Sequence, residues 1–121
     1  MERDVVLIKR YEKQVSLFDR EINLVVTYVD NGVTVLLTGG DLSHFGATSI
    51  MDEAGNLTSQ CFEGHKEGAI ADKWAKSLFD KYKKPILVSV GIHYDDASKK
   101  QIDEIVMLTD ELLEELLLKN D

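Results

Sequence analysis

The chain has 121 residues, of which 44% are hydrophobic, and these values predict one globular domain covering residues 1–121. Cys61 is the only cysteine, so no disulfide can form within the chain; together with the lack of a signal peptide, this favours a cytoplasmic protein. The formal net charge is −8 and no basic stripe occurs, which argues against nucleic acids and anionic membranes as partners. No apolar run is long enough to span a membrane.

The first half of the chain alternates between apolar and polar residues, as β-strands do. Two alternating runs, 22–29 and 33–38, flank the pair Asn31-Gly32, whose residues tolerate positive φ and are typical of a tight hairpin turn. A second hairpin is predicted over 47–62, and alternation upstream of the first hairpin adds a further strand. We therefore expect residues 11–62 to form an antiparallel meander.

The second half changes to the helical period. From Lys66 onwards, apolar residues recur every four positions, which predicts an amphipathic helix that ends before Pro85. The near-continuous apolar stretch 85–94 predicts a strand buried on both faces. Ser98 and Gln101 then match a capping box at the start of a last helix.

The last helix carries a long apolar face, made by Ile102, Ile105, Val106, Thr109, Leu112, Leu113, Leu116 and Leu117. Its closing turns are apolar over more than one face, which favours a self-association surface there. Together, the elements predict an α+β fold in which an antiparallel sheet of about five to six strands carries two α-helices on one face.

The stretch that joins the two predicted hairpins, "GGDLSHFGA", is rich in glycine and contains an acid and a histidine. Gly39 or Gly40 would supply a positive φ, and Gly46 would allow a close backbone contact. Such turns expose N–H groups, as does the start of the first helix, so an anion site is an alternative. The stretch matches neither the dinucleotide-binding fingerprint nor the Walker loop.

The three histidines occur near the ends of predicted elements, where rigid scaffolds place functional residues. His44 lies in the glycine-rich stretch, His65 precedes the first helix, and His93 ends the last strand. Their spacing is too long for a metal-binding signature, so we expect no metal site. We expect the glycine-rich stretch, the start of the first helix and the end of the last strand to form one accessible patch. Histidines scattered as hydrogen-bonded scaffold residues are the alternative.

Three stretches, "TGGDLSHFGA", "GHKE" and "VGIHYDDAS", make the sequence resemble the LpdD-like family of prenylated-flavin chaperones over roughly residues 15–118. The family pattern has an aliphatic residue where Phe45 stands and an asparagine where Asp96 stands. The matching positions are Gly39, Gly40, Asp41, His44, Gly46 and Ala47, then Gly64, His65, Lys66 and Glu67, then Gly91, Ile92 and His93.

The resemblance implies a fold like that of proteasome assembly chaperones, a homodimer, and a non-enzymatic accessory role. In that role the protein assists a UbiD-type, prenylated-flavin decarboxylase of hydroxybenzoate-like acids and binds prenylated FMN only transiently. The residues expected to bind the ligand or partner are Gly39, Gly40, Asp41, His44, Gly46, His65, Lys66, Glu67 and His93.

Two alternatives stand beside the accessory role. One is a small decarboxylase subunit that uses His44, His65 or His93 as acid–base groups, because imidazole transfers protons near neutral pH. The other is a dimeric module that binds flavin or an anion. Decarboxylation of aromatic acids normally needs a cofactor as electron sink, which weighs against unaided catalysis.

Overall fold

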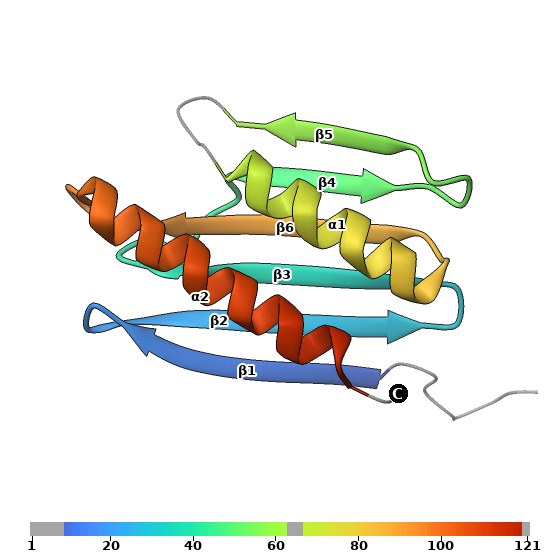
Figure 1. The fold of residues 1–121 in the computed structure, drawn as a ribbon, viewed down its shortest axis with the longest axis horizontal. Coiled ribbons are helices and arrows are strands. Elements are labelled where there is room, and N and C mark those ends of the chain that lie inside the picture. Colours follow the sequence, from blue (N-terminus) through green and yellow to red (C-terminus); the bar gives the residue numbers. More distant parts are fainter. Residues whose placement is uncertain (1–8, 63–66, 120–121) are drawn as a thin grey trace, which may run out of the picture.

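The computed structural model describes residues 9–62 and 67–119, which form a single sheet and two helices. The fold is α+β, as the sequence predicts, with the helices on one face of the sheet (Figure 1). In chain order the elements are β1 (Lys9–Leu17), β2 (Arg20–Val29), β3 (Gly32–Gly40), β4 (Ala47–Met51), β5 (Leu57–Cys61), α1 (Gly68–Tyr82), β6 (Ile86–His93) and α2 (Lys99–Leu117).

The six strands lie in the order β1-β2-β3-β6-β4-β5, so the expected meander over residues 11–62 is wrong at one point. β6 is inserted between β3 and β4, parallel to the first and antiparallel to the second. Local alternation cannot reveal this, because it identifies a strand but not its neighbours. The reason is burial: β6 has the most continuous apolar sequence, which suits a central position in the sheet.

The turn of the first predicted hairpin also differs from the expectation. Val29 pairs with Gly32, so the turn residues are Asp30 and Asn31, and neither Asn31 nor Gly32 adopts a positive φ. Gly32 instead begins β3 and packs against the carbonyl oxygen of Pro85, which accepts a hydrogen bond from the next amide, Val33, at 3.1 Å. Contact with the start of β6 therefore sets the position of this turn.

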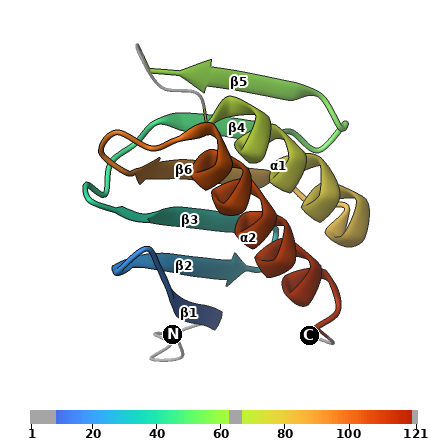
Figure 2. The same cartoon turned by 60° about the vertical axis from the view of Figure 1, so that its left-hand side comes forward.

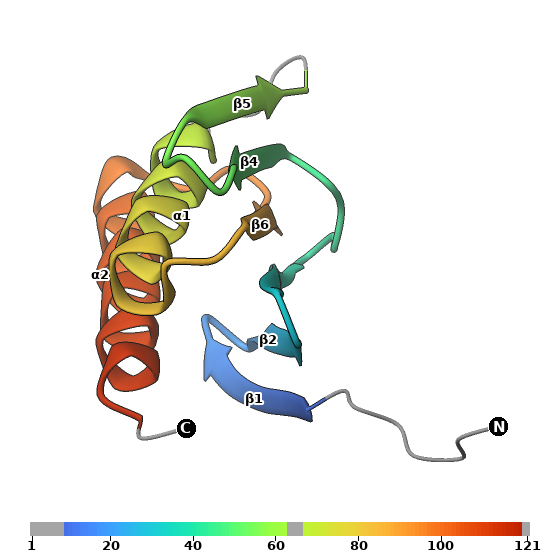
Figure 3. The ribbon, with the colours of Figure 1, turned by 90° about the vertical axis from the view of Figure 1, so that its right-hand side faces the viewer.

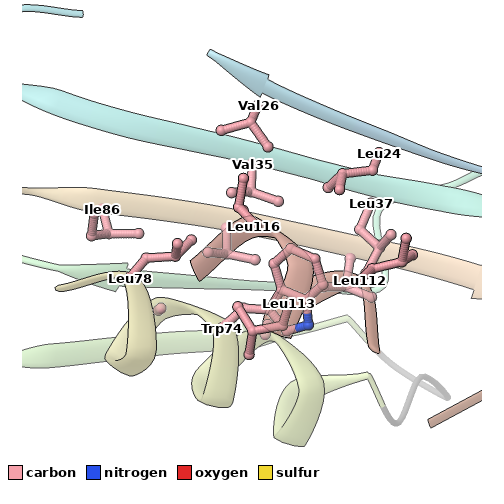
Figure 4. Packing of buried hydrophobic residues seen from close by; sticks show 14 of the residues in the cluster. Leu24, Val26, Val35, Leu37, Trp74, Leu78, Ile86, Leu112, Leu113 and Leu116 are labelled. Carbon is pink, nitrogen blue, oxygen red and sulfur yellow. The ribbon is translucent and has the colours of Figure 1, made fainter. Parts of the chain in front are cut away.

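The core fills the space between the sheet and the helices (Figure 4). Trp74, from α1, is fully buried and is among the largest side chains there. The apolar sides of β2, β3 and β6 supply Leu24, Val35 and Val88 from the other direction. Both helices cover the same face, and no helix of the described residues lies on the opposite face (Figures 2 and 3).

The apolar face of α2 is only partly buried, which corrects the expected self-association surface. Leu112, Leu113 and Leu116 lie in the core of their own chain, so the large exposed apolar side chain of the closing turns is Leu118. The exposed apolar side chains within α2 instead lie in its first half, where Ile102 is 49%, Val106 38% and Met107 60% exposed. The start of α2 therefore borders a space that α1 does not fill.

Candidate functional site

The connection between β3 and β4, residues 41–46, passes the end of β6. The Asp41 amide donates a hydrogen bond to the His93 carbonyl at 2.6 Å, and the Gly46 amide donates one to the Val90 carbonyl at 2.9 Å. A Cβ at Gly91 would coincide with the carbonyl oxygen of His44. Side chains alternate along a strand and Val90 points into the core, so a Cβ at Gly91 would point to the opposite face of the sheet. Residues 41–46 therefore cross on the face opposite the helices, where Figure 3 shows the segment.

The glycines of this crossing allow two backbones to touch. Gly40 has a φ of 82°, and a Cβ there would strike the His93 carbonyl, its partner in register. Gly39 has a φ of 153°, and its Cβ would strike the backbone of β2 at Glu21. The sequence prediction of a positive φ at Gly39 or Gly40 is therefore confirmed at both positions.

Asp41 connects three segments through its carboxylate. Oδ1 accepts a hydrogen bond from the Arg20 Nε at 2.7 Å, and Oδ2 accepts one from the Asp95 amide at 2.8 Å. The Asp95 amide first, and the Arg20 guanidinium in addition, hold the pKa of Asp41 below its ordinary value. The Asp95 carboxylate in turn accepts a hydrogen bond from the His93 Nε2 at 2.9 Å. Asp41 thus joins the start of β2 to the segment between β6 and α2.

We expect replacement of Asp41 by asparagine to lower stability most at neutral pH. Asp41 is a carboxylate whose pKa is lower in the folded state, so its stabilisation is present above about pH 4 and is lost as the pH falls through the folded pKa. The unfolding midpoints of wild type and Asp41→Asn, measured by circular dichroism, should differ at pH 7 and approach each other below about pH 4. Midpoints that differ equally at every pH would contradict this role of the charge.

His44 and Glu67 form a second contact at the same end of the sheet. The His44 Nδ1 lies 3.1 Å from the Leu42 carbonyl oxygen, and its Nε2 lies 3.3 Å from the Glu67 carboxylate. Both partners are hydrogen-bond acceptors, so the His44 ring lies between a carbonyl oxygen and a carboxylate oxygen. The side chains are only 13% and 12% exposed. A Cβ at Gly46 would lie against the Glu67 carboxylate.

The structure brings together six of the nine predicted site residues: Gly40, Asp41, His44, Gly46, Glu67 and His93. The rings of His44 and His93 lie 6.3 Å apart. Gly39 lies one residue earlier, against β2, and His65 and Lys66 are outside the described residues. The convergence matches the prediction, but His44 and Glu67 are largely covered, so the expected accessibility is wrong for them. Ligand or partner binding at these residues stays a prediction.

A pocket of about 460 Å³ adjoins this cluster on the helix face of the sheet. It lies among the start of α1, the end of β6 and the first half of α2, and Glu67 and His93 line it as well. Most of its walls are apolar, chiefly Ile70, Ile92, Ile102, Ile105 and Val106. The volume is in the range of small-molecule sites, and the composition suits an apolar ligand with few polar groups.

The sequence did not predict this pocket, because Ile102 and Val106 fall on the apolar face of the last helix. Their spacing is that of a buried stripe, and the sequence does not show that α1 and α2 leave space between their starts. Lys73 and Asp110 make an ion pair of 2.7 Å between the two helices, and both residues line the pocket. Among the lining residues that the structure describes, Lys73 is the only lysine or arginine, and it is paired with Asp110.

Among residues 9–62 and 67–119, no group of three or more histidine, cysteine or acidic side chains could hold a metal ion. Neither helix in the described part of the chain has the length and apolar content needed to cross a bilayer.

Comparison with protein families identifies the chain. Residues 17–121 match the family described as "Prenylated flavin chaperone LpdD-like domain". The chain belongs to this family. The match includes the residue 41–46 crossing and every described residue that lines the pocket. Membership places this LpdD-like domain among the prenylated flavin chaperones, as the sequence resemblance implied.

A solved structure confirms the fold of the LpdD-like domain. A chain in the crystal structure of a chaperone complex for yeast 20S proteasome assembly superposes with a TM-score of 0.62, over 92% of this chain and 96% of that one. The identity is 10%, so the likeness shows the fold alone. Comparison with curated proteins gives no significant match.

Proposed function

We propose that this LpdD-like domain holds prenylated FMN in the pocket between α1 and α2 and delivers it to a partner flavoprotein. We propose further that the partner is a UbiD-type decarboxylase of hydroxybenzoate-like acids, and that the domain works as a cytoplasmic homodimer without catalysis of its own. The pocket is the observation that carries the proposal, because it supplies a ligand-sized apolar site in a chain of this family.

The chemistry of the pocket suits the ring system of a prenylated flavin better than its phosphate. Aliphatic side chains of Ile70, Ile102 and Val106 offer apolar surface to fused rings that carry an added prenyl-derived group. His93 supplies a polar atom for a ring oxygen or nitrogen. Lys73 is already paired with Asp110, and Glu67 is acidic, so the described walls offer a phosphate no unpaired lysine or arginine. The phosphate therefore extends from the mouth into solvent.

Filling the pocket tests where the flavin binds. Val106 lines the pocket and Met107, the next residue, does not, although both are exposed on α2. We expect Val106→Trp to raise the Kd for prenylated FMN at least about tenfold, equivalent to about 1.4 kcal/mol, because indole occupies the site. Met107→Trp should bind like wild type. Anaerobic calorimetric titration gives both values.

An unchanged Kd for Val106→Trp, or an equal loss with Met107→Trp, would contradict binding in the pocket. Titration with prenylated riboflavin separates the ring from the phosphate: we expect affinity within about tenfold of that for prenylated FMN, since the phosphate stays outside. The partner is tested by mixing the loaded domain with an apo-decarboxylase of the UbiD type and following transfer of flavin absorbance to the enzyme on a size-exclusion column.

A further inference from the structure

The ion pair of Lys73 with Asp110 differs from the other polar contacts of the pocket, because both of its members line the pocket. The other charged or polar side chains of the described lining each contact a residue outside it: Glu67 contacts His44, His93 contacts Asp95, and Tyr94 contacts the Leu17 carbonyl. The pair therefore places both a donor and an acceptor of hydrogen bonds at the pocket wall.

The pair closes the inner end of the pocket. α1 and α2 run side by side in the same direction over the sheet (Figure 1), and Lys73 and Asp110 are the last lining residues of their helices. Ile70 and Val106, which also line the pocket, precede them by about one helical turn. Trp74, directly after Lys73, is fully buried in the core. A ligand that enters between the helix starts therefore passes apolar walls before it reaches the pair.

The pair keeps hydrogen-bonding capacity beyond its own contact. The Lys73 ammonium has three N–H groups, and one of them donates to the Asp110 Oδ1 at 2.7 Å. The Asp110 Oδ2 accepts no hydrogen bond from the residues that the structure describes. Because the two charges compensate each other at this distance, the pair suits a neutral group with an adjacent acceptor and donor better than it suits an anion.

We propose that Lys73 and Asp110 recognise the imide edge of the flavin, in the pyrimidine ring of its fused ring system. An imide is neutral at pH 7 and places carbonyl oxygens on both sides of an N–H group, which complements an ammonium beside a carboxylate. The Asp110 carboxylate accepts the hydrogen bond of the ring N3–H, and the Lys73 ammonium donates to the neighbouring carbonyl oxygen.

This inference rests on the proposed function and adds the orientation of the ligand to it. With the pyrimidine ring at the inner end, the central ring, which carries the ribityl phosphate, lies nearer the mouth. Such an orientation agrees with a phosphate that extends into solvent. It also assigns Lys73 and Asp110 as residues that determine which ring systems the pocket accepts.

A purely structural role for the pair makes a different prediction. The two side chains are 55% and 36% exposed, and ion pairs at such positions contribute little to stability. Loss of a structural contact would weaken every ligand to the same extent. Loss of a recognition contact would instead change the preference between two ligands that differ only at the imide, so this preference is the quantity to measure.

Methylation of the flavin at N3 removes the N–H group that Asp110 is proposed to bind. We expect wild type to bind N3-methyl prenylated FMN at least about tenfold more weakly than prenylated FMN, in anaerobic calorimetric titrations. A variant Asp110→Leu should bind the two ligands within about threefold of each other, because the acceptor is gone. Glu111→Leu removes the exposed acid next along α2, which does not line the pocket, and should keep the wild-type preference.

A second pair of variants tests the donor. Lys73→Met keeps the length of the side chain but not the ammonium, so we expect it to bind both ligands at least about fivefold more weakly while the preference between them remains. Lys76→Met changes an exposed lysine of α1 that does not line the pocket, and should bind like wild type. Asp110→Asn keeps an acceptor oxygen and should keep most of the preference. Circular dichroism establishes that each variant is folded.

Equal affinities of wild type for prenylated FMN and its N3-methyl derivative would overturn the inference, as would a folded Asp110→Leu that keeps the full preference. In both cases binding in the pocket would still be judged by the Val106→Trp titration. A wild type that binds neither ligand would overturn the proposed function and this inference together.

Discussion

Replacing Gly91 by alanine is expected to lower the free energy of unfolding by about 3 kcal/mol. The new methyl group would overlap the His44 carbonyl oxygen, which belongs to the backbone of the 41–46 segment and not to a flexible side chain. Relief requires the residue 41–46 segment to lift away from β6, which breaks the hydrogen bonds from the Asp41 and Gly46 amides. Urea unfolding followed by circular dichroism measures the loss.

Gly32→Ala is the matched control for this change. A Cβ at Gly32 would lie 3.4 Å from the Pro85 carbonyl oxygen, at the near limit of ordinary contact, and the φ of Gly32 needs no glycine. We expect its effect to stay within about 1 kcal/mol. If Gly91→Ala were as mild as Gly32→Ala, the 41–46 segment would not lie on β6 as described.

Truncating Trp74 to alanine is expected to cost about 3–5 kcal/mol, because the indole is fully buried between α1 and the sheet. The indole N–H has no hydrogen-bond partner among the described residues. Trp74→Phe removes this unsatisfied donor together with some volume, so we expect it to cost about 1–2 kcal/mol. Lys76→Ala, at an exposed position of the same helix, should change stability by less than about 0.5 kcal/mol.

Circular dichroism at 222 nm suits this series, because it does not depend on the tryptophan that the variants remove. Equal losses for Trp74→Ala and Trp74→Phe would contradict the role given to indole volume. A loss of less than about 1 kcal/mol for Trp74→Ala would contradict its position at the centre of the core.

Much of the fold could be predicted from sequence because the signals are local. The four-residue recurrence of Ile70, Trp74, Leu78 and Tyr82 predicted α1, and the structure shows it. Ser98 and Gln101 form the predicted capping box, with hydrogen bonds of 2.8 and 3.1 Å. Each of these patterns depends on residues a few positions apart in the chain.

Features set by distant segments could not be predicted in this way. The insertion of β6 between β3 and β4 depends on which apolar strand is best buried, and the position of the turn at Asp30 depends on contact with Pro85. The glycines did predict a close crossing at residues 39–46, but nothing local shows that its partner is Gly91.

Only part of the candidate site could be predicted from the sequence. Asp41, His44 and His93 were identified because polar residues at the ends of strands gather at one end of a sheet. The pocket beside them arises from the space between two helices, and its isoleucines resemble core residues in sequence. The exposure of Ile102 and Val106 indicates the pocket, but this exposure is known only from the structure.

Binding of prenylated FMN between the helices can be tested most directly by NMR of isoleucine methyl groups. Four isoleucines line the pocket, Ile70, Ile92, Ile102 and Ile105, and three described isoleucines lie elsewhere, Ile22, Ile50 and Ile86. On anaerobic titration with prenylated FMN, the pocket methyl signals should shift in a saturable way and show contacts to the ligand protons, while the other three stay in place. Saturable shifts confined to Ile22, Ile50 and Ile86, or no shift at saturating ligand, would contradict the proposed function.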